Sequence, residues 1–198
     1  MPQRILSEPV GTLRKVINEE GPATTGVARG VRLVREGKET TPELGMELRE
    51  GDTLGTNGQT RIVLASTLGS EIFLGPDSEI KVRKGSVFLT RGRLFSKLRE
   101  LFRLETRYVV AGVEGTEVDL SVDSGDVVSL AVLEGKVRVE SRTERWSARS
   151  YGEGEYGVIR GEAEPSKRLL DPKARRSIQR WMVEFERPRE QPGAGIAR

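Results

Sequence analysis

The sequence predicts an all-β fold of short antiparallel strands, stacked as a twisted β-solenoid or a sandwich, with one C-terminal α-helix. Three patterns predict this fold. Apolar and polar residues alternate along residues 108–140, as they do in half-buried strands. From residue 60 onward, short apolar segments recur about every 8–10 residues with glycine or aspartate between them, which is the spacing of short strands. Residues 172–187 instead carry apolar side chains at helical spacing.

Residues 108–140 read as two consecutive β-hairpins. The turn at residues 123–126 and the glycine at 135 separate three strand segments. Gly115 interrupts a strand pattern, which indicates a bulge or a close approach of two backbones. Every second position in the three segments is apolar and is predicted to face the core: Val118, Leu120, Val122, Val128, Leu130, Val132, Val137 and Val139.

The rest of the chain supplies shorter elements of the same kind. Residues 18–26 are predicted as a loop, because Gly21-Pro22 breaks the pattern. Residues 96–104 are ambiguous, since Leu94, Leu98, Leu101 and Phe102 have the spacing of a short helix or helical loop. Strands are predicted at residues 10–16, 28–34, 61–64, 71–74, 79–82 and 86–89, and a closing pair lies within 146–159.

The C-terminal segment predicts a capped amphipathic helix. Asp171 is expected as the N-cap and Pro172 as the first helical residue. Either the apolar stripe packs on the β body and closes a sheet edge or solenoid end, or it docks a partner protein. The stripe contains Ile178, Trp181, Met182 and Phe185.

The same patterns divide the chain into four parts. Residues 1–9 are expected to be a loose N-terminus, and residues 10–160 form the β domain. Residues 161–188 comprise a linker and the basic amphipathic helix, and residues 189–198 are expected to be disordered.

Composition limits the chemistry that this chain can perform. The 198 residues include no Cys and no His, which excludes thiolate nucleophiles, thiolate metal sites and imidazole bases. The glycines precede strands rather than helices, so no phosphate-binding loop is predicted. The spacing of Asp119, Asp123 and Asp126 matches no calcium loop, and a solvated turn is favoured. We therefore expect no enzymatic activity, no metal and no cofactor.

Charge is distributed unevenly along the chain. Lys and Arg number 33 against 30 Asp and Glu, a net charge of +3, and the C-terminal part is the basic part. A nucleic-acid or anionic-polymer binder acting through this helix is the alternative function, although stacking on single strands is not expected because interleaved aromatics are scarce. The candidate anion-binding residues are Lys167, Arg168, Lys173, Arg175, Arg176 and Arg180.

Three ordered motifs resemble those of the FecR domain, which is named after the bacterial ferric-citrate regulator. Residues 113–118 resemble V-x-G-T-x-F/V, residues 132–137 resemble v-x-E-G-x-V, and residues 51–56 resemble G-D-x-L-x-T. The resemblance implies an extracytoplasmic, solenoid-like β domain of the kind that relays a signal from an outer-membrane transducer. It implies fold-determining roles for the motif residues Gly51, Asp52, Gly115, Thr116, Glu134 and Gly135.

The expected function is therefore a non-enzymatic protein-interaction or sensing module of the bacterial cell envelope, with another protein as its partner. The sequence contains no apolar run of the roughly 20 residues that span a bilayer, and residues 1–13 lack the apolar core of a secretory signal. We expect an extracytoplasmic location if a signal or anchor was trimmed, and a cytoplasmic one otherwise.

Overall fold

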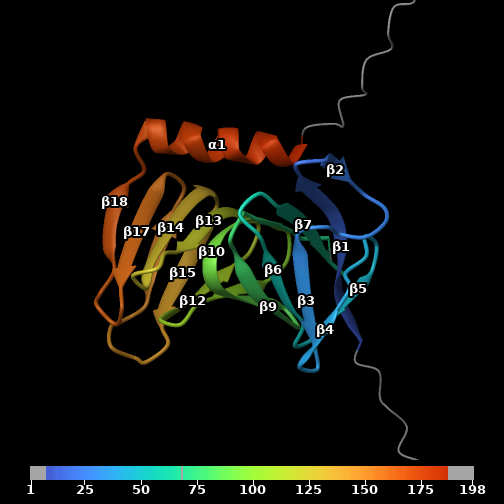
Figure 1. Cartoon of the computed structure of the whole chain (residues 1–198). Coiled ribbons are helices and arrows are strands. Elements are labelled where there is room, and N and C mark those ends of the chain that lie inside the picture. The colour runs from blue at the N-terminus through green and yellow to red at the C-terminus, as the bar shows by residue number, and fades with distance from the viewer. Residues whose placement is uncertain (1–7, 68, 187–198) are drawn as a thin grey trace, which may run out of the picture.

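The structure is a computed structural model that describes residues 8–67 and 69–186. Two β-sheets lie face to face, and a single long helix lies across the outside of one of them, which gives three layers (Figure 1). The predicted fold, an all-β body of short strands with one C-terminal helix, is confirmed.

The sheet under the helix, here called the helix-side sheet, contains only antiparallel neighbours. Its strands follow one another in the order β1, β7, β8, β10, β13, β14, β17 and β18, and β2 and β5 also pair with β1. The bounds are β1 Pro9–Asn18, β2 Gly21–Ala23, β5 Glu47–Arg49, β7 Arg61–Ser66, β8 Glu71–Leu74, β10 Ser86–Leu98, β13 Thr116–Val122, β14 Val127–Glu134, β17 Glu155–Arg160 and β18 Ser166–Leu169.

The second sheet, here called the outer sheet, runs in the order β4, β3, β6, β9, β10, β11, β12, β15 and β16. Only the β10–β11 pair within it is parallel. Strand β10 belongs to both sheets: residues 86–91 pair in the outer sheet and residues 92–98 in the helix-side sheet. The remaining bounds are β3 Val31–Arg35, β4 Lys38–Thr40, β6 Thr53–Thr56, β9 Glu79–Arg83, β11 Phe102–Glu105, β12 Val109–Val113, β15 Lys136–Ser141 and β16 Arg149–Gly152.

The main hydrophobic core lies between the two sheets. Leu54 and Leu104 from the outer sheet and Leu74 and Leu120 from the helix-side sheet are fully buried in it. Each such side chain stabilises the fold by roughly 1.5–3 kcal/mol relative to exposure. All eight alternating residues predicted to face the core between residues 118 and 139 are buried here, so that prediction is confirmed.

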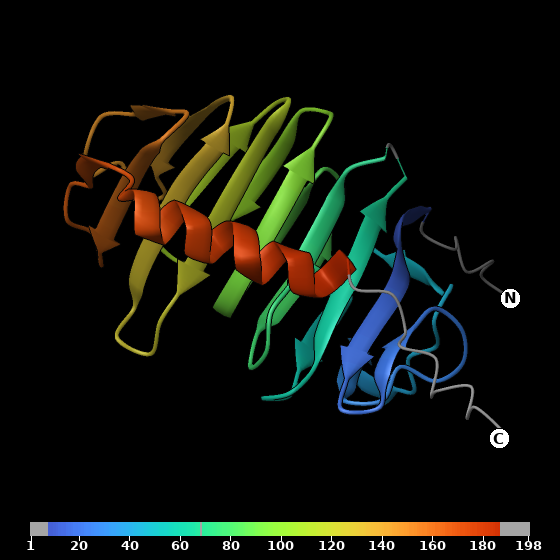
Figure 2. The ribbon, with the colours of Figure 1, turned by 90° about the horizontal axis from the view of Figure 1, so that it is seen from above.

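A smaller second core holds helix α1 (Pro172–Glu186) on the helix-side sheet, and Figure 2 shows the helix crossing several strands obliquely. Ile178, Met182 and Phe185 are buried, and Trp181 packs at their margin. The stripe therefore packs on the β body, as the first of the two alternatives predicted, but the helix covers a face of the sheet and does not close an edge or a solenoid end. The sheet residues of this second core are Val63, Phe73, Phe95, Ala131 and Leu133.

Polar contacts tether the C-terminal half of the helix to the same sheet. Lys15 Nζ donates a hydrogen bond to the carbonyl of Phe185 at 2.6 Å. Arg61 pairs with Glu184 at 2.8 Å, and Lys97 pairs with Glu186 at 3.5 Å. The helix starts as predicted, because Asp171 Oδ1 accepts hydrogen bonds from the backbone N–H groups of residues 173 and 174.

Four local predictions were wrong. The second predicted hairpin does not form, because β14 pairs with β13 and β17 in the helix-side sheet, whereas β15 pairs with β12 and β16 in the outer sheet. Residues 96–104 form no helix: β10 continues to Leu98, and β11 begins at Phe102. The helical spacing is coincidental, because Leu101, which completes it, is 73% exposed in the loop between the two strands. The predicted linker contains strand β18, and the predicted loop at residues 18–26 contains the short strand β2.

Several predictions about the chain ends fall on residues that are not described. The disordered tail predicted at 189–198 lies outside the described residues, as do most of the loose N-terminus and the predicted helix end at residue 187. Pro9, the last residue of that predicted N-terminus, instead begins β1. In the described part of the chain, no helix is long and apolar enough to cross a membrane.

Gly115 and Gly135 lie side by side in the turns that precede β13 and β15. Both have left-handed backbones, with φ of 58° and 82°. A Cβ atom on Gly115 would meet open space, whereas one on Gly135 would lie 2.8 Å from the carbonyl oxygen of Gly115 and 2.6 Å from Cγ2 of Thr116. The close approach of two backbones that was expected at Gly115 therefore occurs at Gly135. At Gly115, glycine is required only because the backbone has a positive φ.

Gly135→Ala should cost more stability than Gly115→Ala. The left-handed backbone costs either variant about 1–2 kcal/mol, and only Gly135→Ala adds a clash with backbone. Urea denaturation should therefore give a larger loss of unfolding free energy for Gly135→Ala by at least about 1 kcal/mol. Equal losses would show that the turn moves apart freely and that the close approach is not a constraint.

Phe185→Ala should destabilise the whole chain by about 3–5 kcal/mol, because it empties a fully buried site in the second core. Val183→Ala on the same helix is the matched control, since Val183 is 52% exposed; its cost should stay below about 0.5 kcal/mol. Denaturation followed by near-ultraviolet circular dichroism would measure both. An unchanged midpoint for Phe185→Ala would mean that helix docking contributes nothing to the stability of the β body.

Candidate functional site

The motif residue Asp52 forms a buried ion pair that fixes a turn. It is 1% exposed, and Arg35 donates to both carboxylate oxygens, from Nε at 2.9 Å and from Nη2 at 2.6 Å. The backbone N–H of Arg49 donates to Oδ2 at 2.8 Å. The hydrogen bond to Asp52 raises the pKa of Arg35, against the opposing effect of burial. The pair joins β3 to the turn before β6, a structural role consistent with the positive φ of Gly51.

A second charged cluster lies on the outer sheet around Glu105. Its Oε2 accepts hydrogen bonds from Arg83 at 3.0 Å and from Arg142 at 2.8 Å, and both guanidinium groups lie over the ring of Phe88. Burial alone would raise the pKa of Glu105, but the hydrogen bonds from Arg142 and Ser86 and the charge of Arg83 outweigh it and lower the pKa. The ionised carboxylate therefore joins β9, β11 and the segment after β15.

The third cluster lies under helix α1. Arg93 of β10 donates to both oxygens of Asp119 of β13, at 2.7 Å from Nε and 3.2 Å from Nη2. The same guanidinium lies 4.4 Å from the ring centre of Trp181. Burial raises the pKa of Asp119, and Arg93 opposes the rise. Arg93 thus connects the helix to a buried carboxyl group of the sheet.

A groove of about 590 Å³ extends from this cluster beneath the N-terminal half of α1. Small side chains make the hollow, among them Ser121, Ala131 and Ala174. Tyr156 donates a hydrogen bond to Ser129 at 3.2 Å across its floor. The volume lies in the range of small-molecule sites. Its one buried carboxyl group is already engaged by Arg93, so the groove offers hydroxyl groups, apolar walls and, at its rim, the exposed Arg168.

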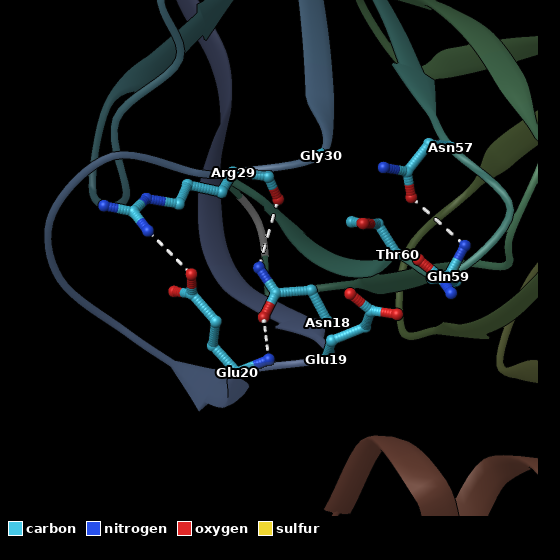
Figure 3. A pocket seen from close by; sticks show the side chains of 8 residues that line it. All are labelled: Asn18, Glu19, Glu20, Arg29, Gly30, Asn57, Gln59 and Thr60. Atoms are coloured by element: carbon cyan, nitrogen blue, oxygen red, sulfur yellow. Dashed lines mark hydrogen bonds and ion pairs between the residues drawn. The ribbon is translucent and has the colours of Figure 1, made fainter.

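A smaller hollow of about 160 Å³ lies where β1, β3 and the β6–β7 turn meet (Figure 3). Asn18 Nδ2 donates to the carbonyl of Arg29 at 3.3 Å, and Arg29 pairs with Glu20 at 2.6 Å. The hydroxyl of Thr60 is buried and has no hydrogen-bond partner within the described ranges. These groups mainly hold the loops together, and the space is too small for more than a few water molecules.

The remaining motif residues gather at one place, around the turns that precede β13 and β15. Thr116 is 2% exposed, and its hydroxyl makes no hydrogen bond to any described residue. Glu134 is exposed and pairs in register with Glu117. Gly51 and Asp52 lie apart from this group, in the turn that joins β5 to β6.

The three aspartates of residues 119–126 do not converge. Asp119 faces Arg93, Asp123 accepts hydrogen bonds from backbone N–H groups of its own turn, and Asp126 contacts Arg107 and Tyr108. Among residues 8–67 and 69–186, no group of three or more acidic side chains is arranged to hold a metal ion.

The six candidate anion-binding residues are split between two environments. Lys167 pairs with Glu155 at 2.8 Å, and Arg175 pairs with Glu153 at 3.1 Å. The other four are exposed and have no ion-pair partner in the described part of the chain: Arg168, Lys173, Arg176 and Arg180.

Strand β18 leaves one edge of the helix-side sheet open (Figure 1). It pairs with β17, and the N–H of Leu170 continues that ladder by bonding the carbonyl of Gly154 at 2.7 Å. Because ladder bonds alternate along an antiparallel strand, Lys167 and Leu169 direct their N–H and C=O groups away from β17. The side chain of Leu169 is 83% exposed beside them.

Sequence reasoning did not single out Glu105, Arg93 or the edge strand β18 as important. The partners of Glu105 lie 22 and 37 residues away, and Arg93 and Asp119 lie 26 residues apart. No local pattern marks such pairs. The sequence around β18 carries only the apolar pair Leu169-Leu170 within a charged segment, and in the structure Leu169 is exposed while Leu170 packs against the second core.

Comparison with known proteins identifies the family of the central segment. Residues 52–138 match the family model described as FecR protein, which confirms the resemblance carried by the three motifs. No curated protein matches the chain.

Two crystal structures of a proposed anti-sigma factor from Parabacteroides distasonis, at 2.50 Å and 1.65 Å resolution, share the fold with a TM-score of 0.56. Each is 17% identical in sequence and aligns over 66% of this chain. The alignment spans 63% and 64% of the lengths of those chains.

The Glu105 cluster predicts a pH dependence of stability. Because the pKa of Glu105 is lowered in the folded state, its ionised form stabilises the fold above the ordinary pKa of about 4.5, and this contribution is lost as the pH falls through the folded pKa. Wild-type protein should therefore lose more unfolding free energy on acidification from pH 5 to pH 3 than Glu105→Gln does.

Glu140→Gln is the matched control, because Glu140 pairs with Arg138 on the exposed surface. Its acid profile should follow the wild type. If Glu105→Gln and Glu140→Gln gave the same profile, the buried cluster would have no special role in acid stability.

Proposed function

We propose that this chain is a non-enzymatic protein-interaction module of the bacterial cell envelope, and that it regulates a signalling pathway by binding a partner protein at the open edge of β18. The observation that carries the proposal is the outer edge of β18 beside the exposed Leu169, which no strand of the described residues pairs, on a domain that contains a FecR segment. The extracytoplasmic location follows the family.

The edge has the properties of a strand-addition site. Lys167 and Leu169 offer outward N–H and C=O groups, which a partner strand would pair, and Leu169 offers an apolar side chain for a pocket on that strand. Natural sheets usually protect such an edge with charge, proline or a covering segment, since it otherwise attracts other chains. Lys167 supplies charge, but its ammonium group is engaged by Glu155.

The charged clusters support a structural scaffold rather than a catalytic centre. Asp52, Glu105 and Asp119 each accept hydrogen bonds from arginines that come from other strands or loops. Such bonds fix strand positions and leave these carboxylates poorly available for acid–base chemistry. The fold likeness to a proposed anti-sigma factor also supports a regulatory role.

Photo-crosslinking in a producing bacterium tests the proposal. A benzophenone amino acid at Arg168, on the edge strand, should give one covalent adduct of discrete mass. The same group at Lys136, exposed on the outer sheet, should not. Leu169→Pro should reduce the adduct at least about tenfold, because it removes an outward N–H group while leaving the bonds to β17 intact.

Leu169→Ala separates the backbone contribution from the side chain, since alanine keeps the N–H group; it should retain more of the adduct than Leu169→Pro. The proposal fails if Leu169→Pro leaves the adduct unchanged, or if Arg168 and Lys136 yield the same products.

A further inference from the structure

We propose that the outward face of helix α1 binds an anionic lipid surface. The residues that would make the contact are Lys173, Arg176, Arg180 and Val183, here called the basic ridge. This proposal stands on the placement of these four side chains and does not depend on a protein partner at β18.

The four residues share one face of the helix. Their spacings of three, four and three residues place them on one line about 15 Å long, at a rise of 1.5 Å per residue. Ile178, Met182 and Phe185 occupy the opposite face and are buried against the sheet. Because the helix lies along the outside of the helix-side sheet (Figure 2), the basic ridge points away from the protein.

The charge of the basic ridge is not neutralised by the rest of the described chain. Lys173, Arg176 and Arg180 are exposed and take part in no ion pair there. The acidic residues of the helix cannot offset them, because Glu184 pairs with Arg61 and Glu186 with Lys97 on the sheet side. Three positive charges therefore face solvent in a row.

Two features favour a bilayer over a nucleic acid as the anionic partner. Val183 is 52% exposed and continues the row, so one apolar side chain can enter the headgroup region beside the cations. Because the basic ridge runs straight along the helix axis, all of its cations can also reach the phosphates of a planar bilayer surface at the same time. Each cation near an anionic bilayer contributes about a fivefold gain in binding.

Vesicle co-sedimentation at 50 mM salt tests the assignment with the full chain. Vesicles of phosphatidylcholine containing 30% phosphatidylglycerol should bind the protein, and pure phosphatidylcholine vesicles should not. The double variant Arg176→Gln/Arg180→Gln should lose affinity by about 25-fold, the product of two fivefold contributions. Both side chains are exposed, so the melting temperature should not change and a folding defect would be recognised.

Lys81→Gln/Lys136→Gln is the matched control: it removes the same net charge from exposed positions on the outer sheet, away from the helix. It should retain at least half of the wild-type affinity. Equal losses for the two double variants would show that net charge alone governs binding, and the proposal would be overturned.

A duplex DNA of 20 base pairs, followed by fluorescence anisotropy in the same buffer, distinguishes the other anionic partner. Val183→Ser should weaken vesicle binding several-fold and leave DNA binding unchanged. If the protein binds the duplex more tightly than the anionic vesicles, and Arg176→Gln/Arg180→Gln abolishes that binding, the ridge is a nucleic-acid site and the lipid assignment is wrong. Absence of binding to anionic vesicles would overturn it equally.

Discussion

The structure depends on burial of the helix-side sheet on both of its faces. One face forms the main core with the outer sheet, and the other forms the second core with α1. This double burial explains why Phe95 and Leu94, consecutive in β10, are both almost inaccessible to solvent. It also explains why the helix is part of the domain rather than an appendage, since without α1 the rings of Phe73 and Phe95 would face water.

Charge–charge contacts add specificity to this apolar framework. Each buried carboxylate described above has an arginine partner from another segment, so a strand that shifted register would leave a charge unpaired in a partly dry environment. The Arg93–Asp119 pair shows the competing costs most clearly. Burial disfavours the ionised carboxyl group, and the guanidinium that offsets this also packs on Trp181 of the helix. Arg93 thus makes both an ion pair with the sheet and a cation–π contact with the helix.

Sequence patterns correctly predicted the elements that bury one face and leave the other face polar or partly exposed. Val118, Leu120 and Val122 alternate with polar or partly exposed neighbours, so period two was visible, and the start of α1 was marked by Asp171 and Pro172. The β10–β11 segment was misread because the exposed Leu101 of the connecting loop happens to complete a helical spacing with Leu98 and Phe102. Glu105 and its two arginines could not be predicted, since strand topology, not local spacing, brings them together.

Strand β10 has a consequence for how the molecule comes apart. A single continuous strand pairs with β9 and β11 in one sheet and with β8 and β13 in the other. If β10 separates from its neighbours in one sheet, its backbone hydrogen bonds in the other sheet are disrupted as well. The two sheets are therefore expected to unfold as a single cooperative unit. Peripheral strands such as β4 and β18 can fray singly, so amide protons should exchange slowest along residues 86–98 and fastest at the two ends of the stack.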